Sequence, residues 1–170
     1  MTQTLDLRRL RLRSGEQYRG GRDLTLEPFA LAGQQYLAVP DTVEADVAVT
    51  KATTGTVFEL AFPVRLQGPC FRCLEDAALE LDVRAREYQA TDPQGTEELT
   101  TPYIEEDSFD LAACARDTIA DLLPEQILCR ADCAGLCPEC GRNLNTDPHG
   151  HEAASGDPRW GALADLRNTL

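Results

Sequence analysis

Three successive runs of alternating apolar and polar residues occupy the middle of this 170-residue sequence. They cover residues 43–51, 56–67 and 78–88. The apolar members are Val43, Ala45, Val47 and Val49, then Phe58, Leu60, Phe62, Val64 and Leu66, then Leu79, Leu81, Val83 and Ala85. Such alternation places one face of a strand against a core and the other in water, and short connections join neighbouring strands antiparallel. The sequence therefore predicts an antiparallel, meander-based β-sheet.

Shorter signals extend this prediction in both directions. The first forty residues predict short strands, broken at Gly20-Gly21, and Pro63 on a polar position of its run indicates an edge strand or a bulge. After an acidic loop over 91–107, Ser108 or Asp107 can cap one packed helix that Pro124 ends. Its apolar stripe would be Leu111, Cys114, Ala115, Thr118, Ile119 and Leu122.

The domain organisation follows from these elements. Asp157-Pro158 is a typical start for a short C-terminal helix. We predict one α+β domain with three parts: a basic N-terminal segment (1–40), the meander and helix (41–124), and a cysteine-rich zinc-knuckle loop with the last helix (125–170).

Charge is spread unevenly along the chain, whose net charge is −13. Residues 1–22 hold six arginines and two carboxylates, a net +4, which leaves −17 for the remainder. An acidic body repels phosphate and suits a basic protein partner. RNA would have to use the N-terminal arginines, of which Arg9, Arg11 and Arg13 would share one face of a strand. The alternative, which the net charge favours, is a solvated face that pairs with the protein's own carboxylates.

The cysteine count indicates a reducing compartment. No apolar run approaches the about 18 residues of a membrane span, and no apolar block follows the basic N-terminus, so we expect a cytoplasmic protein. Seven cysteines there are typical of metal ligands or core thiols rather than disulfides.

Six of these cysteines can form a metal site. Cys129, Cys133, Cys137 and Cys140 can make a local set of four thiolates, or Cys137 and Cys140 can share one ion with Cys70 and Cys73 from the turn between two strands. In both arrangements Cys137 and Cys140 form a zinc knuckle, because Pro138 fixes φ and Gly141 allows a positive φ. Four thiolates leave no open position, so Zn²⁺ would be structural; an iron–sulfur cluster is the weaker option.

Other roles for these side chains are less favoured. His149 and His151 can substitute as ligands, but histidines in so polar a stretch are more often solvated. A redox role for Cys70 and Cys73 lacks the helix N-terminus that makes such thiols reactive. Cys114 lies on the apolar stripe of its helix and is expected to be an inert core thiol. No catalytic signature is present, so we predict no enzyme activity.

Several motifs occur together in a characteristic order. They are Gly68-Pro69-Cys70-Phe71-Arg72-Cys73-Leu74-Glu75, Glu87-Tyr88, Phe109-Asp110-Leu111, Leu122-Leu123-Pro124, the segment from Cys129 to Asn145, and Asp157-Pro158-Arg159-Trp160. Over roughly residues 40–168 the chain resembles the YceD-like family, proteins associated with accumulation of large-subunit ribosomal RNA in bacteria and plastids.

The resemblance implies a non-enzymatic ribosome-biogenesis factor whose partner is ribosomal RNA or a large-subunit ribosomal protein, with no membrane and no small-molecule substrate. Some family members lack the C-terminal cysteines, which implies that the metal stabilises the fold rather than performs the function. The alternative is a zinc-stabilised acidic adaptor with no connection to ribosomes.

Overall fold

The computed structural model describes residues 3–93 and 99–151. The chain, predicted as one domain, divides into two compact units, Met1–Cys133 and Ala134–Leu170. All the named strands and helices of the described residues lie in the first unit. The predicted C-terminal helix lies outside the described residues. None of the helices that are described is long and apolar enough to cross a membrane.

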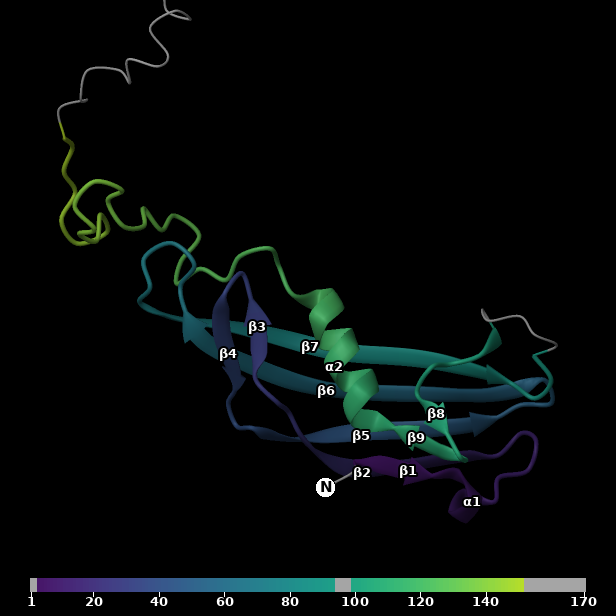
Figure 1. The fold of residues 1–170 in the computed structure, drawn as a ribbon. Helices are drawn as coiled ribbons and strands as arrows, with labels where there is room; N and C mark the ends of the chain where they lie inside the picture. The colour runs from purple at the N-terminus through teal and green to yellow at the C-terminus, as the bar shows by residue number, and fades with distance from the viewer. Residues whose placement is uncertain (1–2, 94–98, 152–170) are drawn as a thin grey trace, which may run out of the picture. The chain divides into compact units, whose positions relative to one another are not determined.

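A six-stranded antiparallel sheet forms the body of the first unit (Figure 1). Its strands are β2 (Gln17–Thr25), β3 (Phe29–Leu31), β4 (Gln34–Ala38), β5 (Thr42–Lys51), β6 (Gly55–Pro69) and β7 (Asp76–Ala90). β5, β6 and β7 are neighbours in chain order, β2 pairs with the other edge of β5, and β4 pairs with the last part of β6 and with β3. The three alternating runs of the sequence are thus adjacent antiparallel strands.

The predicted inward faces of β5 and β6 are confirmed. All nine of their apolar side chains are at most 8% exposed. Across β6 and β7 the register pairs Phe62 with Val83 and Leu60 with Ala85, so apolar side chains meet on one face of the sheet. The outward side chains of these strands are mostly exposed or half-buried. The core therefore lies on one side of the sheet.

A second layer covers that side. It consists of a three-stranded sheet of β1 (Thr4–Asp6), β8 (Ile104–Glu105) and β9 (Ser108–Asp110), together with α2 (Leu111–Leu122). Phe109 of β9 stacks on Phe58 of β6 with ring centroids 4.4 Å apart. α2 packs on β7 and lies across the sheet in Figure 1. The result is a mostly antiparallel α+β fold of two layers.

The beginning of α2 differs from its prediction. Asp110 is the N-cap, and its Oδ1 accepts a hydrogen bond of 3.0 Å from the Ala113 N–H. Ser108 belongs to β9 and Asp107 to the tight turn before it, where Glu106 and Asp107 both have positive φ, so neither can cap the helix.

The rest of α2 follows its prediction with one exception. Leu111, Cys114, Ala115 and Ile119 are buried as predicted. Leu122 was predicted to belong to the apolar stripe, but it is 44% exposed and is not part of the buried face of the helix. The helix ends before Pro124, at the position that the proline predicted, because the residue before a proline avoids the helical conformation.

The N-terminal segment differs more. The predicted break at Gly20-Gly21 is wrong, since both glycines lie inside β2 and pair with Val47 and Asp46 of β5. The short helix α1 (Leu7–Leu10) occupies the point where the alternation slips. The edge position predicted for Pro63 is confirmed locally. β5 pairs with β6 only up to Ala61, and β4 pairs with β6 from Leu66, so among the described strands β7 alone pairs with β6 at Pro63.

Candidate metal centres and the open face of the sheet

Four cysteines of the first unit bring their sulfur atoms together. The Sγ atoms of Cys70, Cys73, Cys129 and Cys133, the four-thiol cluster, all lie within 4.8 Å of one another. The Cys70 and Cys133 sulfurs are 3.8 Å apart, and those of Cys73 and Cys129 are 3.6 Å apart. A tetrahedron with Zn–S bonds of about 2.3 Å has edges of about 3.8 Å. The donor set and its spacing therefore fit a tetrahedral zinc ion.

The hairpin between β6 and β7 positions the first two thiols. The Cys70 N–H donates to the Glu75 carbonyl at 2.7 Å, and the Leu74 N–H donates to the Cys70 carbonyl at 3.0 Å. Leu74 has a φ of 61°, which closes the turn. Cys70 and Cys73 are both buried, so their sulfurs are held on the inner side of this turn.

Two hydrogen bonds hold the segment after α2 against the hairpin. The Phe71 N–H donates to the carbonyl of Ile127 at 2.8 Å, and the Arg72 guanidinium donates to the Cys133 carbonyl at 3.0 Å. Ile127 is itself buried. These contacts bring Cys129 and Cys133 to the sulfurs of the turn.

The protonation of the four-thiol cluster reflects the crowding of its sulfurs. Burial raises the pKa of Cys70, but backbone N–H groups of Cys73, Cys129 and Arg72 hydrogen-bond its sulfur and bring the pKa down to about 6. Desolvation, followed by the thiols around it, raises the pKa of Cys129 to about 12. Burial likewise raises the pKa of Cys73. The first thiol of the cluster ionises readily, but its negative charge opposes ionisation of the other three. A bound divalent cation would offset the repulsion among four thiolates.

A second set of ligand atoms lies in the C-terminal unit. Cys137, Cys140, His149 and His151, the Cys2His2 cluster, have ligand atoms within 4.8 Å of one another. The Cys137 N–H donates to the Arg142 carbonyl and the Gly141 N–H donates to the Cys137 carbonyl, both at 2.8 Å. Gly141 has the positive φ that the sequence predicted, 73°. His149 directs Nε2 at the Cys140 sulfur, 3.1 Å away.

These groupings differ from the ligand sets derived from the sequence. Cys129, Cys133, Cys137 and Cys140 were predicted to surround one ion, with Cys70 and Cys73 as the alternative partners of Cys137 and Cys140. The structure instead joins Cys129 and Cys133 to Cys70 and Cys73, and joins Cys137 and Cys140 to the two histidines. The cause is local: the hairpin binds the chain at Ile127, and a bridge between Leu136 and Asn143 closes the knuckle on itself.

The two histidines are candidate ligands to which sequence reasoning gave too little weight. His149 and His151 were expected to be solvated, yet their side chains are only 17% and 30% exposed. A signal was available, because a Cys-x-x-Cys pair followed by two histidines supplies the two sulfur and two nitrogen donors of a common kind of zinc site. The single residue between His149 and His151 is shorter than the usual three to five, so the pattern is not the typical one.

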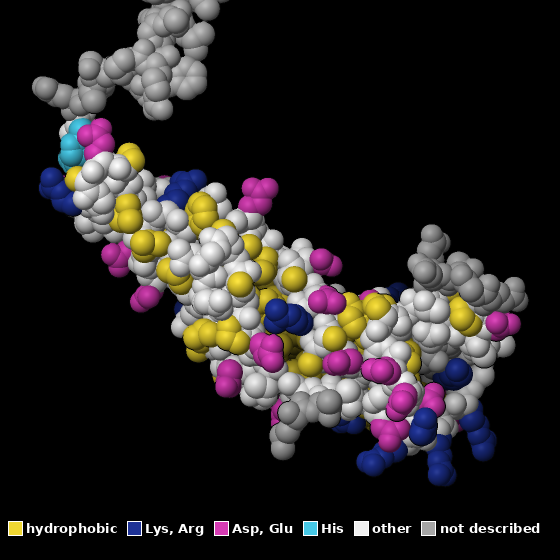
Figure 2. All heavy atoms as spheres, viewed as in Figure 1, with side chains coloured by type: hydrophobic (Ala, Val, Ile, Leu, Met, Phe, Trp, Pro, Cys, Tyr) yellow, Lys and Arg dark blue, Asp and Glu magenta, His cyan; other side chains and the backbone are white. Residues whose placement is uncertain are grey.

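The N-terminal arginines do not form the predicted stripe. Arg9 lies in α1, Arg11 has a left-handed φ of 44°, and Arg13 lies in the loop that follows. Arg9 pairs with Asp6 at 3.1 Å and Arg8 with Asp107 at 3.0 Å, which is the pairing with the protein's own carboxylates that the net charge favoured. Figure 2 shows Lys and Arg side chains beside Asp and Glu side chains in the region of α1.

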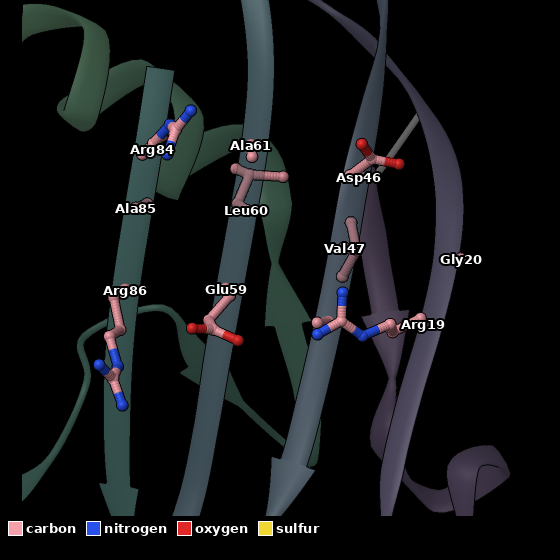
Figure 3. A pocket seen from close by; sticks show the side chains of 11 residues that line it. Arg19, Gly20, Asp46, Val47, Glu59, Leu60, Ala61, Arg84, Ala85 and Arg86 are labelled. Carbon is pink, nitrogen blue, oxygen red and sulfur yellow. The ribbon is translucent and has the colours of Figure 1, made fainter. Parts of the chain in front are cut away.

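The outward face of the large sheet carries a shallow hollow of about 530 Å³ (Figure 3). Arg84 and Arg86 of β7 border it on one side and Arg19 of β2 on the other, with Glu59 and Asp46 on the strands between them. The small side chains Ala48 and Ala61 also line it, which makes it concave. Sequence reasoning missed this group, although all its members except Arg19 lie at outward positions of the alternating runs.

An α+β protein with a cysteine cluster at one hairpin is the class that this fold and site define. A family model described as "Large ribosomal RNA subunit accumulation protein YceD" matches residues 58–167. That match covers more than half of the chain, and the chain belongs to this family.

The chain is also similar to mycobacterial proteins that are named as uncharacterized. Uncharacterized proteins of Mycobacterium tuberculosis (strain CDC 1551 / Oshkosh) and Mycobacterium bovis are each 29% identical over 169 residues, covering 96% of this chain and 80% of the relative. An uncharacterized protein of Mycobacterium leprae is 33% identical over 132 residues, covering 74% of this chain and 55% of the relative. No solved structure matches.

Proposed function

We propose that this protein is a cytoplasmic, non-enzymatic ribosome-biogenesis factor that supports the accumulation of large-subunit ribosomal RNA. The observation that carries the proposal is membership of the YceD family over residues 58–167. The matched region includes the hairpin turn and every cysteine of both clusters.

The four-thiol cluster would hold a structural Zn²⁺ ion. Cys70, Cys73, Cys129 and Cys133 supply four sulfur ligands and fill the coordination shell, which leaves no position for substrate. When bound, the ion would add its binding free energy to folding. In this chain the ion would connect the segment after α2 to the hairpin. The hydrogen bonds of Phe71 and Arg72 already hold these two parts of the chain together.

The hollow on the outward face is our candidate for the RNA contact. Arg84 and Arg86 have no carboxylate within ion-pair distance among the described residues, and the Arg19 guanidinium donates to the amide oxygen of Gln17. Planar guanidinium groups suit bidentate contacts with phosphate. Glu59 and Asp46 repel phosphate, so the arginines would contact a few phosphates rather than a long stretch of backbone.

Complementation in the native cell tests this function. Deletion of the gene should lower large-subunit RNA relative to small-subunit RNA, and the unchanged protein should restore the ratio. The double variant Arg84→Gln/Arg86→Gln should fail to restore it. Arg65→Gln is the matched control. Arg65 is an exposed arginine on the neighbouring strand β6, but it pairs with Glu80 at 3.6 Å.

The same experiment distinguishes the alternative, a zinc-stabilised acidic adaptor. The excess of carboxylates, with a net charge of −13, favours a basic protein as the partner of such an adaptor. An unchanged RNA ratio after deletion, with recovery of a basic non-ribosomal protein on the purified chain, would replace the ribosomal function by the adaptor.

A further inference from the structure

We propose that Cys137, Cys140, His149 and His151 bind a second structural zinc ion, and that this ion folds residues 134–151 separately from the four-thiol cluster. The two clusters share no residue, and each lies within one compact unit. The proposal does not depend on the ribosomal function.

The orientation of His149 is the first argument. Its Nδ1 lies 2.7 Å from the Asp147 carbonyl oxygen. A carbonyl has no proton to donate, so Nδ1 must carry the hydrogen of this bond. In the neutral ring the lone pair is then on Nε2, the atom that faces the Cys140 sulfur at 3.1 Å. A histidine that binds a metal through one nitrogen usually donates from the other to a carbonyl or carboxylate, which fixes the ring.

The knuckle supplies the sulfurs in a fitting arrangement. The Gly141 N–H bonds back to the Cys137 carbonyl, so Cys137 and Cys140 begin and end one tight turn. The rings of His149 and His151 meet edge to face, with centroids 5.0 Å apart, and close the other side. Two sulfurs and two imidazole nitrogens make a usual tetrahedral zinc site without an open position.

The absence of an apolar core among residues 134–151 is an independent argument. Of these residues only Gly135 and Cys137 are buried. Backbone hydrogen bonds such as Leu144 N–H to the Gly135 carbonyl, at 2.9 Å, cannot order so short a segment without buried apolar surface. A metal ion supplies the missing free energy in small folded units of this kind.

Metal stoichiometry of the full chain tests the proposal. With zinc as the only added metal, the unchanged protein should bind two ions per chain. His149→Gln/His151→Gln should bind one, and Cys70→Ser/Cys73→Ser should also bind one. Cys114→Ala is the control, because Cys114 belongs to neither cluster, and it should keep two.

Cobalt identifies which ion is lost. The charge-transfer absorption of bound Co²⁺ grows with the number of thiolate ligands, of which the two clusters contain six. The histidine variant should lose about a third of this absorption, and the Cys70→Ser/Cys73→Ser variant about two thirds, by ligand count.

Trypsin cleavage after the exposed Arg142 reports on folding. With zinc bound, the unchanged protein should be cut there at least about tenfold more slowly than the histidine variant, because local order protects the bond. Cleavage inside β6 should stay slow in both. Two zinc ions in the histidine variant, or one in the unchanged protein, would overturn the proposal. Equal cleavage at Arg142 would show that the ion does not fold this unit.

Discussion

Cys114 lies apart from the other six cysteines, which form the two clusters. Its side chain is 1% exposed on α2 and belongs to neither cluster. Burial, followed by the charge of Glu87, raises the pKa of this thiol to about 12. The packing around Cys114 thus holds the sulfur neutral, which confirms the sequence prediction of a core thiol.

This pKa predicts a pH dependence. A cysteine thiol in the unfolded chain has a pKa of about 8.5, below the value in the folded protein. Between that pH and about 12 the thiol ionises in the unfolded chain but stays neutral in the folded protein. The free energy of unfolding is therefore unaffected below the unfolded pKa and falls as pH rises toward 12. Removing the thiol with Cys114→Ala should therefore flatten the fall of the unfolding free energy between pH 9 and 11, by at most about 1.4 kcal/mol per pH unit. Urea unfolding of both proteins at several pH values measures the difference. Parallel curves would mean that the thiol ionises as freely in the folded protein as in the unfolded chain.

Gly68 is a position where the backbone approaches a side chain closely. A Cβ at this position would lie 2.5 Å from Cδ1 of Tyr36 and 2.6 Å from the Gln35 carbonyl oxygen. The Tyr36 ring cannot move away easily, since it is buried and its hydroxyl donates to the Pro69 carbonyl at 2.8 Å. The glycine allows β4 to lie against the end of β6, next to the hairpin that carries Cys70.

We expect Gly68→Ala to destabilise the protein by roughly 1–3 kcal/mol, the usual cost of overpacking. Gly21→Ala is the matched control in the same sheet. The three atoms nearest to its Cβ would all belong to the flexible Glu44 side chain, so a change within about 0.5 kcal/mol is expected. Thermal unfolding of the two variants measures this difference, and similar melting temperatures would contradict the steric argument.

Strands whose side chains alternate regularly between apolar and polar could be predicted from the sequence. Elements whose conformation depends on pairing with distant segments could not. The strands β5 and β6 needed only the alternation of their own side chains. β2 could not be recognised as continuous, because Gly20 and Gly21 carry no side chain that shows a period; its pairing with β5 makes it one strand. The short helix α1 lies where a strand was predicted for a similar reason: its N-cap, Asp6, is the last residue of β1, which pairs with the distant β9.

The N-cap of α2 gives a prediction for this helix. Asp110→Ala removes the oxygen that accepts from the Ala113 N–H and leaves that donor without its partner. The cost should be about 1 kcal/mol, the usual value for an N-cap. Asp121→Ala, at an exposed position near the other end of α2, should cost less than about 0.5 kcal/mol. Urea unfolding of both variants makes the comparison, and a larger loss for Asp121→Ala would contradict the assignment of the cap.

The ligand groupings depend on the whole chain. The sequence showed which cysteines can bind metal, and all six of them lie in clusters. It could not show which pairs of cysteines meet. Cys129 and Cys140 lie 56 and 67 residues after Cys73, and the entropy of closing a loop changes too little between these lengths to favour one partner. The choice depends on the path of the chain after α2, where the carbonyl of Ile127 accepts from Phe71 and leads Cys129 to the hairpin.

That path gives a prediction about local stability in the first unit. If an ion in the four-thiol cluster fastens the segment after α2 to the hairpin, Cys129→Ser should open this contact without unfolding the sheet. The Phe71 amide, which donates to Ile127, should then exchange its hydrogen at least about tenfold faster, equivalent to about 1.4 kcal/mol of local opening. Amides between β5 and β6 should keep their protection. Cys140→Ser is the control, because Cys140 belongs to the other cluster and its loss should leave Phe71 unchanged. Equal exchange at Phe71 in all three proteins would show that the Ile127 and Arg72 hydrogen bonds hold the segment without an ion.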